Sequence, residues 1–389
     1  MDKCLNNKLR NAISDIKKVW AQIETKDRFI AFSGGKDSLA LSLIIYEAID
    51  EDPPPCLYVH HDMVLPIHLE YMFDLKRKSD LKIDILHPNL NYFDLIDRGI
   101  GFLTLQGSWC KQLLIGTGFL AWLQRKGIKS TKSVVMFRGI SGSEYSKKWH
   151  SPFEIYTHLN MPCFNPLLNF KTEEIVELIT NRYGVPLSPI YKLMERTYCI
   201  CCYTGDSRSH NYFFQKYSMT IEKIQSQIKE LLFDSNIIHK AKLYPEHKTI
   251  EEKFLRHGYN NWRRIKEQNV IGAVKIRKPS GLVIYKVKNP DWIDTQHLSA
   301  VVGKWLVKGD EVRFWDCDEK VTDILIKRMI NCLNCGFCAV ECLGHRRFDR
   351  TQKKLVVENC VQCGNCVRLN YCMGWQHRFW RRVIVKENI

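Results

Sequence analysis

The spacing of hydrophobic positions changes several times along the chain, and each change predicts a different element. Leu9, Ile13, Ile16 and Trp20 recur at helical spacing, so residues 1–27 are predicted to form a helix. Short apolar runs and helical segments then alternate. The predicted elements are strands at 28–32, 56–60, 82–86 and 133–137, with a helix at 39–48. This alternation is typical of an α/β fold with a doubly wound, mostly parallel sheet.

The pattern changes again beyond this α/β part. Residues 209–268 carry helical signals, such as 221–232, whereas 270–315 contain short apolar runs around Pro-Ser-Gly and Lys-Gly-Asp turns. The second pattern predicts a small β-rich module. The predicted domains are an N-terminal helix (1–27), an α/β domain (28–208), a helical linker (209–268), the β-rich module (269–320) and a C-terminal cysteine-rich module (321–389).

Composition narrows the class of protein. A chain of 389 residues with 45% hydrophobic and 26% charged residues is neither disordered nor fibrous, and its length favours about two or three domains. It has no run of about 18 apolar residues and no apolar signal core near its start, so we expect a cytoplasmic protein with no membrane partner. The formal net charge of +16 suits a polyanionic partner such as DNA or tRNA.

The first strong motif lies between the predicted strand at 28–32 and the helix at 39–48. Its residues are Ser33, Gly34, Gly35, Lys36, Asp37 and Ser38. Two glycines let the backbone approach an anion, while successive N–H groups and a helix N-terminus attract negative charge. Lys36 adds a full positive charge for a polyphosphate. The alternative is a tight strand-to-helix turn with Lys36 and Asp37 in solvent.

This loop resembles the pyrophosphatase loop of the adenine nucleotide α-hydrolase-like superfamily, and other stretches resemble its phosphoadenosine phosphosulfate (PAPS) reductase-like branch. Those stretches are 61–66, 109–111, 165–167, 172–180 and 189–199, so the resemblance covers 28–205. It implies binding of ATP or PAPS with Mg²⁺, nucleotide contacts from Asp62, and catalytic roles for Lys36 and Asp37. Ser141 replaces an arginine that this family often has, and Arg138 is a candidate for the missing charge.

Three cysteines within this region have spacings typical of iron–sulfur ligands. Cys199 and Cys202 form C-x-x-C, and Cys110 lies in a loop before a predicted helix. Three ligands to a [4Fe–4S] cluster would leave one iron open to a sulfur or substrate atom. Cys201 is a candidate fourth ligand or catalytic sulfur carrier. A zinc site and buried structural thiols are the alternatives.

Eight further cysteines form two runs in the C-terminal module. The runs are Cys332, Cys335, Cys338 and Cys342, followed by Cys360, Cys363, Cys366 and Cys372. In two-cluster ferredoxins the fourth cysteine of each run binds the other cluster. One predicted cluster therefore takes Cys332, Cys335, Cys338 and Cys372, and the other takes Cys360, Cys363, Cys366 and Cys342. A zinc array is the alternative. The sequence thus predicts three [4Fe–4S] clusters in total.

Three functions fit these motifs. The first is an ATP pyrophosphatase that adenylylates an acceptor for sulfur insertion, similar to the sulfur-incorporation proteins of DNA phosphorothioation, with a cysteine desulfurase as partner. The second is a PAPS or adenosine phosphosulfate (APS) reductase that releases sulfite with electrons from its ferredoxin-like module, itself supplied by an electron donor. The third is an iron–sulfur electron carrier with a vestigial nucleotide domain.

Overall fold

A computed structural model describes residues 3–23, 27–98, 100, 109–142, 151–192, 270–301, 303–342, 345–362, 372 and 381–386. The chain divides into two compact units. The first comprises residues 1–88 and 130–215, and the second comprises 89–129 and 216–389. The predicted helical linker, including 221–232, lies outside the described residues.

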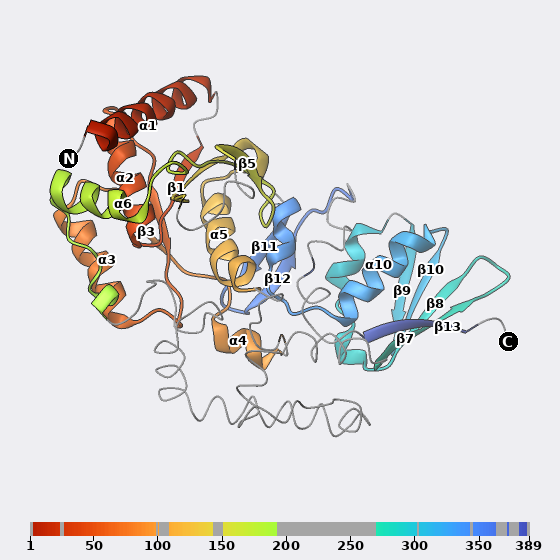
Figure 1. The fold of residues 1–389 in the computed structure, drawn as a ribbon. Helices are drawn as coiled ribbons and strands as arrows, with labels where there is room; N and C mark the ends of the chain where they lie inside the picture. The colour runs from red at the N-terminus through yellow and green to blue at the C-terminus, as the bar shows by residue number, and fades with distance from the viewer. Residues whose placement is uncertain are drawn as a thin grey trace, which may run out of the picture. The chain divides into compact units, whose positions relative to one another are not determined.

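The first unit is built on a six-stranded sheet (Figure 1). Its strands are β1 (Arg28–Ala31), β2 (Cys56–Val59), β3 (Ile83–Leu86), β4 (Val135–Arg138), β5 (Phe153–Tyr156) and β6 (Met161–Phe164). They lie in the order β3-β2-β1-β4-β6-β5, parallel except for β5, which pairs antiparallel with β6. The predicted α/β fold with a parallel sheet is confirmed, whereas the antiparallel edge was not predicted.

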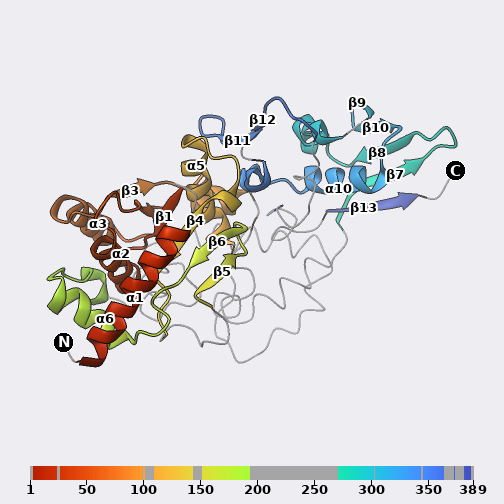
Figure 2. The same cartoon turned by 90° about the horizontal axis from the view of Figure 1, so that it is seen from above.

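Helices that pack against this sheet complete the first unit. They are α1 (Lys3–Gln22), α2 (Lys36–Ala48), α3 (Pro66–Lys78) and α6 (Thr172–Glu177), with short turns η2 (Thr131–Ser133), η3 (Leu178–Arg182) and η4 (Pro189–Lys192). Figures 1 and 2 show α1, α2 and α6 side by side. The buried stripe of α1, including Leu9 and Ile16, joins the same core as α2 because its apolar residues recur at helical spacing. Lys8 of α1 also binds Glu174 of α6 at 2.6 Å.

The second unit contains a five-stranded sheet, a hairpin and several helices. The strands are β7 (Val270–Arg277), β8 (Val283–Val287), β9 (Lys304–Lys308), β10 (Glu311–Trp315), β11 (Arg346–Asp349), β12 (Lys354–Val357) and β13 (Arg381–Lys386). The helices are α4 (Tyr92–Asp97), η1 (Lys111–Gly116), α5 (Thr117–Arg125), η5 (Pro290–Trp292), η6 (Thr295–Ala300), α10 (Glu319–Ile330) and η7 (Phe337–Glu341). The predicted β-rich region contains β7 to β10.

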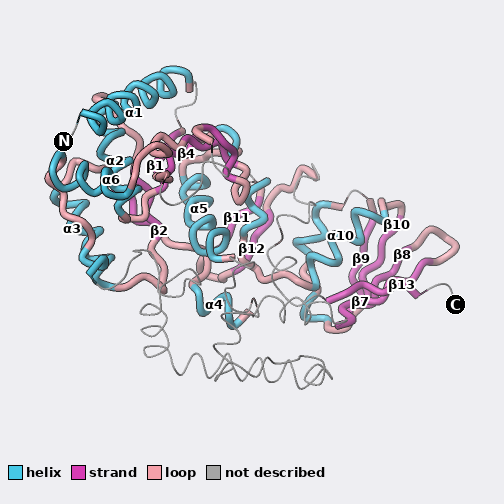
Figure 3. The backbone as a smooth tube through the Cα atoms, viewed as in Figure 1, coloured by secondary structure: helices cyan, strands magenta, loops and turns pink. Residues whose placement is uncertain are grey.

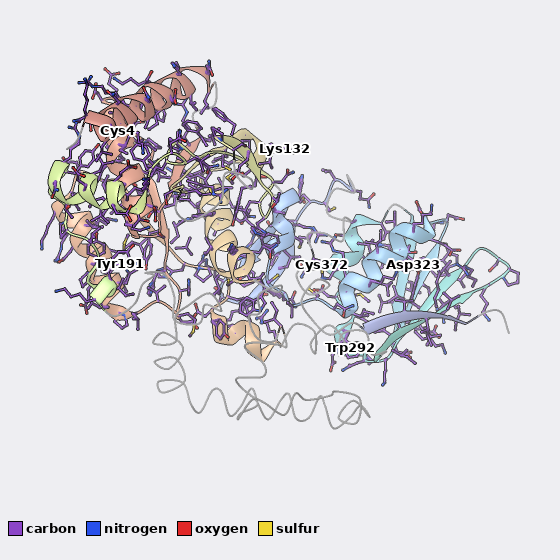
Figure 4. All side chains as sticks on the ribbon, viewed as in Figure 1. Cys4, Lys132, Tyr191, Trp292, Asp323 and Cys372 are labelled. Atoms are coloured by element: carbon purple, nitrogen blue, oxygen red, sulfur yellow. The ribbon has the colours of Figure 1, made fainter. Side chains whose placement is uncertain are left out.

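Helix α10 packs on this sheet, whose order is β13-β7-β8-β10-β9 (Figure 3). Leu325 and Met329 of α10 join the apolar core of the sheet. Asp323, labelled in Figure 4, accepts hydrogen bonds from buried Lys275 at 3.0 Å and from the Tyr285 hydroxyl at 2.6 Å. Strand β13 pairs with β7 in parallel and forms one edge of this sheet.

Residues 89–129 interrupt the first unit in sequence and belong to the second. Arg98 donates hydrogen bonds to the carbonyl oxygens of Leu333 and Lys353, each at 2.8 Å. The Asn89 amide donates to the Cys335 carbonyl at 3.2 Å, and Gln124 donates to the backbone of the β11 hairpin. These bonds fasten the segment that carries Cys110 to the cysteine-rich part of the chain. Among the described residues, no helix is both long and apolar enough to cross a membrane.

Candidate nucleotide loop and cysteine centre

The loop after β1 lies where the strand order of the sheet reverses. Strand β1 pairs with β2 on one side and with β4 on the other, all in parallel. The segments that follow these three strands therefore leave the sheet at the same edge. In open α/β sheets, such a switch point is where ligands bind. The topology thus brings 33–38, Asp62 and Arg138 to one edge.

Hydroxyl groups fix the backbone of the loop. Ser38 Oγ accepts a hydrogen bond from the Ser33 amide at 3.2 Å and donates to the Gly35 carbonyl at 3.0 Å. Ser33 Oγ accepts the Gly35 amide at 3.2 Å. Gly35 is then the N-cap of α2, so the loop leads directly into the positive end of a helix. The two serines predicted to contact a nucleotide also hold the loop in shape.

Gly34 occupies the most restricted position of the loop. Its φ of +72° lies in the left-handed region that favours glycine. A Cβ at this position would overlap Met72 Sδ and would lie 2.9 Å from His68 Cε1, and both side chains are completely buried. The backbone therefore needs glycine for conformation and for space.

Lys36 and Asp37 form the charged part of the loop. Lys36 Nζ lies 2.5 Å from Asp37 Oδ2, and both side chains are largely buried. The Lys36 amide donates to the Tyr191 hydroxyl at 2.8 Å; Tyr191 lies on η4 and is labelled in Figure 4. No described residue donates a hydrogen bond to the buried Asp37 Oδ1. This oxygen can accept a hydrogen bond or bind a cation.

His68 supports the loop from α3 and was not predicted from the sequence. Its Nε2 bonds the Ser33 carbonyl at 2.8 Å, and its Nδ1 bonds Ser188 Oγ at 3.0 Å. The first bond requires a proton on Nε2, so the Ser188 hydroxyl donates to Nδ1. Burial lowers the pKa of His68, which favours this neutral ring. A single histidine on a helix gives no sequence signal for such a role.

The other predicted nucleotide residues have different surroundings. Asp62 lies in the turn after β2, beside the buried His61 and Met63. Arg138 ends β4 and is bound to Glu154 at 2.6 Å. The next residue, Gly139, passes so close to α2 that a Cβ would lie 2.6 Å from the Asp37 carbonyl oxygen. The segment after β4 therefore packs against the loop through Gly139.

Among the first set of predicted cluster ligands, the structure describes one. Cys110 is the N-cap of η1 and follows Trp109, a buried residue that stacks on Tyr92 at a ring distance of 5.3 Å. The other members of this set, Cys199, Cys201 and Cys202, lie outside the described residues. Their predicted roles as cluster ligands and sulfur carrier stay predictions.

Four cysteines of the C-terminal module are neighbours in the second unit. The pKa of Cys332 is raised well above its ordinary value by burial and then by the charges of Cys372, Cys335 and Cys338. The pKa of Cys335 is raised to about 12 by burial and then by Cys338 and Cys372. These charge effects indicate that the thiols of Cys332, Cys335, Cys338 and Cys372 lie in one region of the second unit. Cys372, labelled in Figure 4, comes from the second run.

Both cysteine runs begin with the same turn. The Asn334 amide donates to Cys332 Sγ at 3.2 Å, and the Gln362 amide donates to Cys360 Sγ at 3.4 Å. Asn334 and Gln362 have φ values of 49° and 52°, in the left-handed region. Amide donors stabilise a thiolate, so these turns are suited to binding a metal. Cys363 and Cys366 lie outside the described residues.

A single metal ion is not indicated by the described side chains. Within the described ranges, no group of three or more His, Cys, Asp or Glu residues is placed to hold one ion. An ion such as zinc needs each of its ligand atoms within about 2.3 Å of the ion itself. A four-iron cluster binds each thiolate to a different iron, so its ligand sulfurs lie further apart. The two ferredoxin-type clusters at the C-terminal cysteines stay predictions.

Comparison with known proteins gives only distant likenesses. No protein-family model and no curated protein matches the sequence. A PAPS reductase from Candida auris is similar over 51% of this chain and 96% of its own, with 11% identity and a TM-score of 0.37. The FMN adenylyltransferase of Candida glabrata shows 14% identity over 49% and 60%, with a TM-score of 0.33. An NMN synthetase from Francisella tularensis shows 13% identity over 48% and 73%, also with a TM-score of 0.33. At these values the likenesses support no argument about activity.

Proposed function

We propose that the protein is an iron–sulfur ATP pyrophosphatase-type enzyme of sulfur metabolism that adenylylates an acceptor, a nucleic acid, for sulfur insertion. The observation that carries this proposal is the loop of residues 33–38 at the switch point of the sheet. It combines a left-handed Gly34, a helix N-terminus at Gly35 and a buried Lys36–Asp37 pair. These features suit a polyphosphate rather than a neutral ligand.

The nucleotide step uses the groups of the loop. Lys36 and the amides at the start of α2 would neutralise the β- and γ-phosphates of ATP, which leave together as pyrophosphate. Asp37 Oδ1, which has no donor among the described residues, would help to hold a Mg²⁺ ion, which would supply further positive charge to the phosphates. An acceptor oxygen then attacks the α-phosphorus. Most of the rate enhancement would come from positioning and from charge neutralisation.

Sulfur chemistry is assigned to the cysteines. Three [4Fe–4S] clusters are proposed, with the first at Cys110, Cys199 and Cys202. The repeated turn at Cys332 and Cys360 and the neighbourhood of Cys372 support the two ferredoxin-type clusters. When bound, the clusters would supply electrons and an open iron for sulfur. A cysteine desulfurase would deliver sulfur as a persulfide to Cys201, or to the site of Cys110, Cys199 and Cys202. Two electrons from the ferredoxin-type clusters would reduce it to the sulfide level, and the sulfur would displace AMP from the adenylylated acceptor.

The alternative is a PAPS or APS reductase that uses two electrons to split the sulfonucleotide into sulfite and a nucleotide. One observation favours it. Residues 89–129, which carry Cys110, are fastened to the cysteine-rich segment by Arg98 and Asn89. Electron transfer from a ferredoxin-type cluster to a cluster at Cys110 would explain why these parts form one compact unit.

An anaerobic assay separates the two functions. Iron-loaded protein is incubated with ATP and DNA or tRNA, and pyrophosphate is measured; a parallel sample receives PAPS and dithionite, and sulfite is measured. Lys36→Ala should abolish whichever release the wild type shows, of pyrophosphate or of sulfite. Lys82→Ala, which removes an exposed lysine paired with Asp52, should leave it unchanged. Pyrophosphate release that is unchanged in Lys36→Ala would contradict the proposal. Sulfite release with no pyrophosphate would establish the alternative.

A further inference from the structure

A buried guanidinium with no hydrogen-bond acceptor among the described residues lies next to the first cysteine run. Arg328 is in the last turn of α10, four positions before Cys332, and is only 1% exposed. Its Nε, Nη1 and Nη2 atoms are all buried, and no described residue accepts a hydrogen bond from them. A buried, uncompensated charge costs several kcal/mol, so this guanidinium requires an anion.

His297 on η6 lies close to this guanidinium. Its side chain is 3% exposed, and neither ring nitrogen has a hydrogen-bond partner among the described residues. Burial, together with the charges of Arg328 and Arg346, lowers the pKa of His297 to about 3. The ring is therefore neutral and carries one N–H donor. Leu298 of η6 and Leu325 of α10 share one apolar core, so the elements that carry His297 and Arg328 pack together.

Arg346 connects this group to a predicted cluster ligand. It is 1% exposed, and its Nη1 donates a hydrogen bond to Cys338 Sγ at 3.4 Å. We name Arg328, His297 and Arg346 the Arg–His cluster. It brings two guanidinium groups and an imidazole together beside thiols, in a part of the protein that excludes water.

Nearby carboxylates do not supply the missing negative charge. Glu358 is bound to Arg347 at 2.6 Å, and Asp349 accepts the amides of its own turn. The sequence contains no Asp or Glu between Asn359 and Lys386, a stretch that includes the whole second cysteine run. The anion that the Arg–His cluster requires is therefore not a carboxylate of this hairpin or of this run.

The position of η6 indicates which anion fits. Gln296, beside His297, accepts the Val357 amide at 3.0 Å, directly before the second run. Gln362, within that run, donates to the Val301 carbonyl at 3.1 Å, directly after η6. Both ends of η6 are thus held by hydrogen bonds, and the described thiol that the Arg–His cluster contacts is Cys338 of the first run. A four-iron cluster held by four thiolates has about two negative charges and sulfur acceptors, which match buried N–H donors.

We propose that the Arg–His cluster is an electrostatic site for the predicted iron–sulfur cluster of Cys332, Cys335, Cys338 and Cys372, to which Arg328 and His297 would donate N–H groups while Arg346 donates to Cys338 Sγ. This inference rests on the proposed iron–sulfur function. Reduction adds one negative charge to a cluster, so neighbouring cations favour the reduced form. The Arg–His cluster therefore raises the reduction potential of this iron–sulfur cluster.

The test is a potentiometric titration of the iron-loaded full chain, followed by electron paramagnetic resonance. Arg328→Met keeps the side-chain length and removes the charge; the iron–sulfur cluster of the first cysteine run should become at least tenfold harder to reduce, a shift of about 59 mV to lower potential. The signal of this cluster is identified by its loss in Cys335→Ser. Arg347→Met, which removes an exposed arginine from the same hairpin, should leave the potential unchanged.

The outcomes separate this inference from the proposed function. Wild-type protein without iron and sulfide would overturn both, whereas loaded clusters with equal potentials in the wild type and Arg328→Met would overturn the inference alone. If Arg328→Met abolishes binding of sulfite or phosphate but leaves the potential unchanged, the inference is overturned, and the ligand of the Arg–His cluster is a small oxyanion. If Arg328→Met does not fold, His297→Leu removes one neutral N–H donor, and a smaller shift in the same direction is expected.

Discussion

Substituting Gly34 by alanine tests the geometry of the nucleotide loop. The new methyl group would meet two obstacles, a φ of +72° and the buried side chains of Met72 and His68. The chain contains a matched control in the same unit. Gly184 has a φ of +65°, and no heavy atom lies within 4 Å of a Cβ built there. Gly184→Ala therefore measures how much a left-handed alanine lowers the free energy of unfolding when the methyl group is not crowded.

The two terms have different sizes. A left-handed alanine costs about 1–2 kcal/mol, so Gly184→Ala should lower the free energy of unfolding by about this amount. At Gly34 the methyl group also overlaps Met72 Sδ and approaches His68 Cε1 to 2.9 Å. The ring of His68 is held on both sides by hydrogen bonds and cannot move away without losing them. Overpacking adds about 1–3 kcal/mol, for a total of about 2–5 kcal/mol.

Urea unfolding and ATP titration provide the two measurements. Gly34→Ala should be destabilised by at least about 1 kcal/mol more than Gly184→Ala and should bind ATP more weakly, because the amides of the loop move. Met72→Ala in the Gly34→Ala background should recover part of the loss by making room for the methyl group. Equal destabilisation of the two glycine variants, with ATP affinity unchanged, would refute the described packing of the loop.

Three further predictions concern single side chains. Tyr191→Phe frees the Lys36 amide for a phosphate oxygen, so ATP affinity measured by calorimetry should rise about two- to tenfold, the scale of one hydrogen bond. Burial lowers the pKa of His61 to about 3, so this side chain stays neutral in the folded protein, whereas in the unfolded chain it gains a proton below about pH 6.5. Between pH 7 and pH 5 this difference should lower the free energy of unfolding by about 2 kcal/mol. His61→Gln should remove this part of the pH dependence. Asp323→Ala leaves Lys275 with Glu319 only and should lower the unfolding free energy by about 1–3 kcal/mol, whereas Asp74→Ala at an exposed pair should change it by less than about 1 kcal/mol.

The elements that the sequence predicted are those whose signal is local. The helical period of 1–27, the strand at 28–32 and the loop that follows each depend on neighbouring residues, and the structure contains α1, β1 and the loop in these places. The support of that loop was not predictable in this way. His68 and Tyr191 contact it from 35 and 155 positions away, and neither contact leaves a pattern in the spacing of residues. The grouping of 89–129 with the cysteine-rich segment likewise depends on bonds such as Arg98 to Leu333.

Arg328 shows the same limit in terms of energy. A basic residue in the last turn of a helix is ordinarily explained by the helix dipole, which stabilises an exposed cation by about 0.3–1 kcal/mol. Burial reverses this balance, because an uncompensated charge in the interior costs several kcal/mol. The sequence contains the arginine but gives no sign of its burial, so only the structure shows that its guanidinium has no acceptor among the described residues. The cysteine spacing alone predicts clusters; the burial of Arg328 and His297 adds the proposed effect on the reduction potential of one of them.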